Sequence, residues 1–206
     1  MFTASAQAQL SFGAKAGLNL TNISQKWGGK KPSGDDKFSM KPGFQLGVVA
    51  EYEVTENFVI QPGLVFAQQG AQMKEKHGSD WMKYSINLNY LQIPINGQYK
   101  MELSGMNLVL QAGPYIGFAI GGNEKVSWKM DGKKDSDKES IEFGSKDGEM
   151  KRLDFGLGVG AALELGNIQV GVGYNLGLMN LMNGGDSDNF IKNNGIAITA
   201  TYLLKQ

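Results

Sequence analysis

The sequence predicts an all-β fold, namely an eight-stranded antiparallel up-and-down transmembrane β-barrel. In eight segments apolar residues occupy every second position, the alternate positions hold mostly glycine or polar residues, and long and short connections alternate along the chain. Successive side chains of a strand point to opposite faces, and a tilted strand of roughly 9–11 residues crosses a bilayer. The pattern therefore predicts strands with one face toward lipid.

The clearest strand pair spans 153–165 and 168–178, with a turn at Gly166-Asn167. One face carries Leu, Val, Ile and Phe, while the other is rich in glycine and includes Gly156, Gly158, Gly160, Gly171 and Gly173. A sheet in water would cover its second face with larger polar side chains. An apolar face toward lipid and a small or polar face toward the interior are typical of a transmembrane barrel. We expect the glycines to make room inside a narrow barrel.

The other strands are expected at 10–20, 43–53, 58–69, 84–101, 107–121 and 195–204. In the fourth strand of the chain, Tyr84, Ile86, Leu88 and Tyr90 share one face, but Leu91, Ile93 and Ile95 continue on the other. This change predicts a β-bulge or bend near Tyr90-Leu91. Pro94 favours it, because proline cannot donate a hydrogen bond to a neighbouring strand.

Four long polar connections are expected at 21–41, 70–83, 122–151 and 180–194, and the connections between them are short. In bacterial outer-membrane barrels the short turns and both termini face the periplasm, and the long loops face outside. Within the longest loop, Val126, Trp128 and Met130 alternate, and 141–143 offers a return partner. A hairpin is therefore expected to extend beyond the membrane.

Composition excludes several classes of protein. The 206 residues carry a formal net charge of zero, so the basic face that nucleic-acid binding requires is not indicated. No apolar run approaches the roughly 18 residues of a transmembrane helix. Residues 1–8 contain Ala6-Gln7-Ala8, a small-x-small pattern typical of a secretory cleavage site, and are expected to be a signal-peptide remnant or a disordered N-terminus. A single exported barrel domain is then expected at 9–206.

Several segments carry a family resemblance that covers nearly the whole chain. They are GAKAGLNLTNIS at Gly13, PGFQLGVVAEYEVTENFVIQPGLVFAQQG at Pro42, YLQIPINGQYK at Tyr90, LQAGPYIGFAIGG at Leu110 and LDFGLGVGAALELGNIQVGVGYNLGLMNL at Leu153. The chain resembles the small outer-membrane β-barrel proteins labelled porin-family or PorT-like, which share the architecture of OmpA/OmpX-type barrels. The resemblance implies an outer-membrane location and names no reaction.

Strand alternation places six ionisable side chains in the interior: Lys15, Glu51, Glu53, Arg152, Asp154 and Glu164. Ionised groups inside a barrel must be paired or hydrated. About eight strands enclose a space that side chains can fill, so these residues are predicted to form a structural polar network. Arg152 is expected to bridge Asp154, Glu51 or another inward acid near the outer mouth. The alternative is a narrow conducting path along the same residues.

Aromatic residues prefer the two membrane interfaces. The residues expected there are Trp27, Trp81 and Trp128 on the long-loop side, together with Tyr52, Tyr174 and Tyr202. Lysines 26, 30, 31 and 37 are candidates for contact with lipopolysaccharide, although a solvated loop explains them equally well.

The predicted function is therefore a structural or surface-interaction role for a monomer without catalytic activity, cofactor or metal. Its expected partners are outer-membrane lipid, lipopolysaccharide, and an extracellular protein or glycan. Three alternatives stay open: a narrow channel for small solutes, a lipid-modifying enzyme using His77, Ser79 and Asp80, and a soluble lipocalin-like carrier. The carrier would have the same strand count but the opposite polarity of the two faces.

Overall fold

The structure is a computed structural model that describes residues 10–32, 38–130, 132–146 and 149–204. The expected signal-peptide remnant at 1–8 lies outside these residues. In the described part of the chain, no helix is long and apolar enough to cross a membrane.

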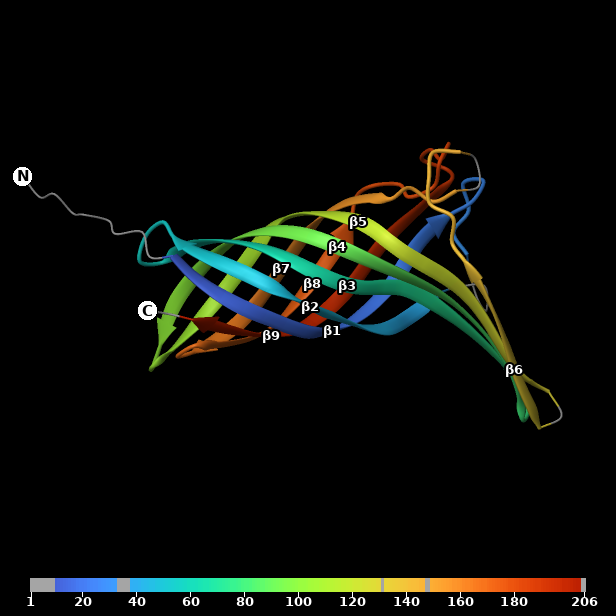
Figure 1. Cartoon of the computed structure of the whole chain (residues 1–206), viewed down its shortest axis with the longest axis horizontal. Coiled ribbons are helices and arrows are strands. Elements are labelled where there is room, and N and C mark those ends of the chain that lie inside the picture. The colour runs from blue at the N-terminus through green and yellow to red at the C-terminus, as the bar shows by residue number, and fades with distance from the viewer. Residues whose placement is uncertain (1–9, 33–37, 131, 147–148, 205–206) are drawn as a thin grey trace, which may run out of the picture.

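The described residues form nine antiparallel strands (Figure 1). Their bounds are β1 Leu10–Lys26, β2 Ser39–Glu53, β3 Phe58–His77, β4 Asp80–Leu103, β5 Met106–Met130, β6 Lys133–Ser140, β7 Leu153–Leu165, β8 Ile168–Gly177 and β9 Phe190–Leu204. Eight of them close into a ring, because β1 pairs with both β2 and β9, and β5 pairs with both β4 and β7. The ninth strand, β6, pairs with β5 alone. The predicted eight-stranded up-and-down ring is confirmed.

Three short connections lie at one end of the ring, at 54–57, 104–105 and 166–167. The chain enters β1 and leaves β9 at this same end, which we call the turn end, and the opposite end is the loop end (Figure 1). Ser104 and Gly105 both have positive φ angles, 46° and 90°. Such a pair is favoured in two-residue hairpin turns, whose twist matches that of the flanking strands.

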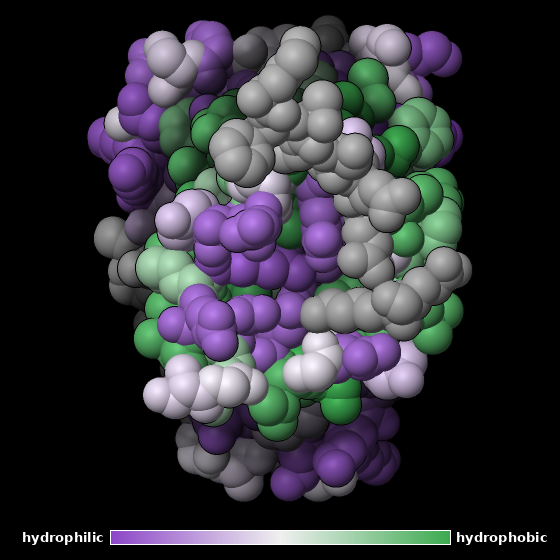
Figure 2. Space-filling model, turned by 90° about the vertical axis from the view of Figure 1, so that its left-hand side faces the viewer, coloured by the Kyte–Doolittle hydropathy of each residue, from purple (hydrophilic) through white to green (hydrophobic). Residues whose placement is uncertain are grey.

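The two faces of the strands have the predicted polarity. Leu18 is 63% exposed while its neighbour Asn19 is 5% exposed, and Val170 is 54% exposed while Gln169 is 5% exposed. Outward apolar side chains continue around the ring and form an apolar belt. In a view onto the turn end, hydrophilic side chains gather in the middle and hydrophobic ones at the sides (Figure 2). This is the polarity of a barrel in lipid.

A bulge lies beside Tyr90, as predicted, but the extra residue belongs to β5, and the switch of apolar residues from one face of β4 to the other has a different cause. The β3–β4 register runs without a break through Tyr90 and Leu91. The irregularity lies between β4 and β5, where Asn89 pairs with Gly121 and Tyr90 with Ala119, so Ile120 of β5 is the extra residue. The phase changes because the apolar side chains of β4 face a buried cluster as far as Tyr90 and face lipid from Leu91 onward.

The predicted loop at 70–83 is also wrong, because β3 and β4 continue through it and are joined at residues 78–79. Residues 70–77 of β3, 80–89 of β4, 121–130 of β5 and all of β6 form a four-stranded sheet, the extension. It diverges from the other loop-end segments (Figure 1). A hairpin was expected here, but its return strand is β6, not 141–143.

Two glycines of β7, Gly156 and Gly158, are placed where larger side chains from other strands need space. A Cβ atom built on Gly156 would collide with the carbonyl oxygen of Leu176 and lie 2.6 Å from the ring of Tyr115, and one on Gly158 would lie 2.8 Å from Oδ1 of Asn175. These contacts are shorter than real Cβ atoms make. The expectation that glycine makes room inside the barrel is therefore confirmed at both positions.

Replacing Gly156 with alanine is expected to lower the free energy of unfolding by about 1–3 kcal/mol, the usual effect of overpacking. Gly121 offers a matched control, since a Cβ there meets no atom within 4 Å. Urea-induced unfolding of the detergent-solubilised barrel would compare the two variants. Equal stability of Gly156→Ala and Gly121→Ala would contradict the close packing of Leu176 and Tyr115 around Gly156.

Candidate functional site

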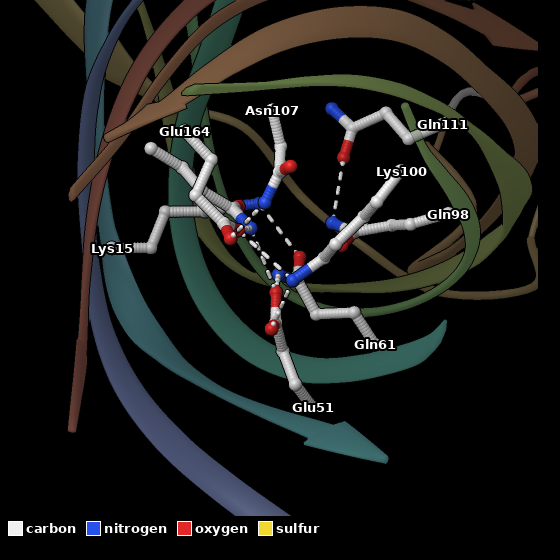
Figure 3. Close-up of polar contacts among 9 residues, drawn as sticks. Lys15, Glu51, Gln61, Gln98, Lys100, Asn107, Gln111 and Glu164 are labelled. Carbon is white, nitrogen blue, oxygen red and sulfur yellow. Dashed lines mark hydrogen bonds and ion pairs between the residues drawn. The ribbon is translucent and has the colours of Figure 1, made fainter. Parts of the chain in front are cut away.

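A charged cluster fills the turn end of the interior, with Lys100 of β4 at its centre (Figure 3). Its Nζ atom lies 2.9 Å from Oε2 of Glu51 and 2.9 Å from Oε2 of Glu164. All three side chains are buried, at 8%, 1% and 2% exposure. One ammonium group is thus shared by two carboxylates that come from opposite parts of the ring.

Amide side chains satisfy the remaining carboxylate oxygens of the cluster. Gln169 Nε2 donates to Glu51 Oε1 at 2.8 Å and to Glu164 Oε2 at 2.6 Å. Gln61 Nε2 donates to Glu51 Oε1 at 2.9 Å, and Asn107 Nδ2 to Glu164 Oε1 at 3.2 Å. Buried ions are tolerated when they are paired and their other lone pairs are bonded, which is the arrangement here.

The structure brings together three of the six ionisable residues expected in the interior. Glu51 and Glu164 form the cluster directly, and Lys15 reaches it through Gln61, with Nζ 3.5 Å from Oε1. Glu53 lies at the rim, half-buried, without an ion pair to any residue in the described ranges.

Lys100 itself was missed by the sequence reasoning, although a signal for it existed. Leu91, Ile93, Ile95 and Tyr99 point outward, so the alternate position Lys100 must point inward. This alternation runs through β4 without a break, because the bulge beside Tyr90 lies in β5.

A small polar cavity of about 70 Å³ lies next along the barrel axis. Its lining includes Lys15, Gln45, Gln92, Gln111 and Asn175. A second void of about 10 Å³ follows beside Asn19 and Asn193. Spaces of this size hold water molecules but no larger solute.

A third layer contains Asp154, which is fully buried. Asn193 Nδ2 donates to Asp154 Oδ2 at 2.9 Å and to the hydroxyl oxygen of Tyr90 at 3.3 Å. Tyr115 lies beside this layer and also lines both voids. Polar side chains from β4, β5, β7 and β9 therefore meet across the barrel at this level.

The expected ion pair of Arg152 with Asp154 or Glu51 is wrong. Arg152 is exposed, its Nη1 donates to the carbonyl oxygen of Ala119 at 3.4 Å, and its guanidinium lies 5.5 Å from the ring centre of Phe143. The residue precedes the first residue of β7, Leu153, so strand alternation does not determine its direction.

An apolar cap closes the loop end of the interior. Its buried residues are Ile23, Ala71, Ile86, Leu88, Tyr90 and Ala119, and partly buried Phe38, Tyr84, Ile141, Phe143, Met150 and Ile191 pack against them. Loop residue Leu181 is fully buried too. Above the apolar belt, therefore, the interior changes from polar to apolar while the outer face becomes polar.

The aromatic residues expected at the interfaces occupy different heights. Tyr52 and Tyr202 point outward near the turn end, and Tyr174 points outward in the loop-end half of β8. Trp81 and Trp128 lie on the extension, and Trp27 follows β1. At about 3.3 Å per residue, Trp81 is about 33 Å along β4 from Leu91, the last outward apolar residue. The interface assignment stays a prediction for the three tyrosines and does not fit Trp81 or Trp128.

A pocket of about 670 Å³ lies above the apolar cap, between the extension and the other loop-end segments. Its lining combines aromatic and apolar residues, such as Phe38, Tyr84 and Met150, with four glutamates, Glu124, Glu139, Glu142 and Glu149. Among the described residues, no group of three or more His, Cys, Asp or Glu side chains is placed to hold a metal ion. The side chain of His77 lies outside the description.

Replacing Lys100 with methionine is expected to lower the free energy of unfolding by about 3–5 kcal/mol, because two buried carboxylates lose their counter-charge. Lys76→Met is the matched control, since Lys76 is exposed and changes there are usually within about 0.5 kcal/mol. Urea unfolding in detergent measures both. Adding Glu51→Gln and Glu164→Gln to Lys100→Met should restore much of the loss, and equal effects of the two single variants would contradict the cluster.

The chain is similar in fold to known outer-membrane proteins. No curated protein matches the chain. Solved structures that it resembles include Ail of Yersinia pestis (15% identity, TM-score 0.42, covering 95% of this chain and 99% of Ail), Neisserial surface protein A (12%, 0.44, 93% and 96%) and a major outer membrane protein of Thermus thermophilus (15%, 0.41, 95% and 99%). The model of the outer membrane protein beta-barrel domain matches residues 5–183. The chain belongs to this family of bacterial outer-membrane β-barrel proteins.

Proposed function

We propose that this outer-membrane barrel conducts no solute and acts through its loop end as a contact surface outside the cell. In this proposal the turn end and the termini face the periplasm, the barrel works as a monomer, and no reaction is catalysed. Its partners are lipopolysaccharide around the barrel and a protein or glycan at the loop end.

One observation carries the proposal: the barrel interior is blocked at two levels along its axis. The Lys100 cluster occupies the turn end, and the apolar cap occupies the loop end. Between them the voids measure only about 70 and 10 Å³. A channel would need one continuous hydrated path, whereas here an ion would meet bonded charges and then an apolar barrier.

The loop end supports the role of contact surface by its shape and composition. The extension stands away from the other loop-end segments (Figure 1), and the pocket above the cap lies between them. Long strands that continue past the belt hold this surface on a rigid scaffold, the usual arrangement for binding residues. The interior polar groups, in contrast, bond to one another and present no space for a substrate.

Planar-bilayer recording tests the closed interior. Reconstituted wild-type protein is expected to give no stable current steps, and the Lys100→Ala/Glu51→Ala/Glu164→Ala variant should stay closed because the apolar cap remains. Heat-modifiable gel mobility of the same samples controls for folding. Reproducible steps from folded wild-type protein would support the narrow-channel alternative and overturn the proposal.

A further inference from the structure

Charges on the extension are sorted between its two faces. Residues directly opposite each other in paired strands share a face. By the registers of β3–β4, β4–β5 and β5–β6, one face carries seven lysines, Lys74, Lys76, Lys83, Lys125, Lys129, Lys134 and Lys138, which we call the lysine face. The other positions on this face are Gly, Gln, Asn, Ser and Trp81, so it has no carboxylate.

Three lysine pairs are directly opposed across neighbouring strands. Lys74 pairs with Lys83, Lys125 with Lys138, and Lys129 with Lys134. Directly opposed residues have Cβ atoms about 5 Å apart, and like charges in that position destabilise a sheet. No ion pair within the described residues neutralises any of these lysines.

The separation of lysines and acidic residues onto opposite faces depends on the register of β6 with β5. The acidic residues Asp135, Asp137 and Glu139 alternate with the lysines and therefore lie on the other face, with Glu124. A slip of one residue would exchange the faces of β6 and bring these acids onto the face of Lys125 and Lys129. The observed register instead keeps lysine opposite lysine, an arrangement that an external anion would relieve.

The lysine face is the continuation of the lipid-facing wall. The β3–β4 register is continuous, so Lys83 has the same parity as the outward residue Leu91, and Lys74 the same parity as Phe66. The extension leaves the barrel at the loop end and diverges from the other loops (Figure 1). Trp81 lies within the face, with Lys74 Nζ 5.1 Å from its ring centre.

We propose that the lysine face binds the phosphate- and carboxylate-bearing saccharide headgroups of the outer leaflet that surrounds the barrel. This inference rests on the proposed function and specifies one surface and one partner for it. Charge complementarity selects an anionic partner, and continuity with the lipid-facing wall selects the leaflet over a soluble polyanion. Each lysine brought to an anionic surface strengthens binding about fivefold.

Hydrogen exchange of β5 and β6 amides tests the proposal in vesicles of phosphatidylcholine alone and of phosphatidylcholine with lipopolysaccharide. Lipopolysaccharide is expected to slow exchange at 123–130 and 133–140 roughly tenfold in the wild type, and about 1 M NaCl should abolish the difference. The variant Lys125→Gln/Lys129→Gln/Lys134→Gln/Lys138→Gln should lose the effect of lipopolysaccharide. In phosphatidylcholine alone it should exchange more slowly than the wild type, because the lysine repulsion is gone.

The matched control replaces four lysines outside the face: Lys133→Gln/Lys146→Gln/Lys151→Gln/Lys192→Gln. It should keep the wild-type response. An equal response of wild type and face variant, or no response of the wild type, would overturn the proposal. Slowing by dextran sulfate in phosphatidylcholine vesicles without slowing by lipopolysaccharide would overturn it in favour of a soluble partner. None of these results depends on conductance, so a failure here is distinguishable from a failure of the closed-barrel proposal.

Discussion

Ring closure is the constraint on which the rest of this structure depends. Backbone N–H and C=O groups at the level of lipid have no water to bond with, so every strand in the belt must be paired on both sides. Pairing of β9 with β1 removes the last free edges. Once the ring is closed with eight strands, its interior is narrow, and each inward side chain must fit against those of opposite strands. The glycines facing Tyr115 and Asn175 are a direct consequence.

The same closure makes buried charge manageable. Lys100, Glu51 and Glu164 come from three strands whose inward side chains meet only because the sheet is closed. The ammonium group of Lys100 bonds to both carboxylates, and amide side chains donate to the carboxylate oxygens as well. Above the belt the requirement changes, because the outer face meets water. Apolar side chains then turn inward and form the cap, while the outer positions become polar or lysine-rich.

Much of the fold was predictable from alternation alone, including all eight ring strands, the Gly166-Asn167 turn and the inward direction of Lys15, Glu51, Asp154 and Glu164. Two errors shared one cause. Apolar residues were expected to face outward along the whole chain, so the inward residues Ile86 and Leu88 placed the bulge in β4 instead of β5, and the polar segment 70–83 suggested a loop. Strand alternation could not predict the direction of Arg152, because this residue precedes β7. Which inward residues contact each other depends on ring registers, and that information is not local in the sequence.

The central claim is that the apolar side chains of β4 face the interior as far as Tyr90 and face lipid from Leu91 onward. This switch defines both where lipid ends and where the apolar cap begins. The chain contains no cysteine, so single cysteines at positions 83 to 95 can carry a spin label without background. In vesicles, accessibility to lipid-soluble oxygen should be high at 91, 93 and 95. Accessibility to a water-soluble relaxation agent should be higher at 83 and 87 than at 86 and 88, which are buried and should be shielded from both reagents. Lipid accessibility at 84, 86 and 88 would contradict the account.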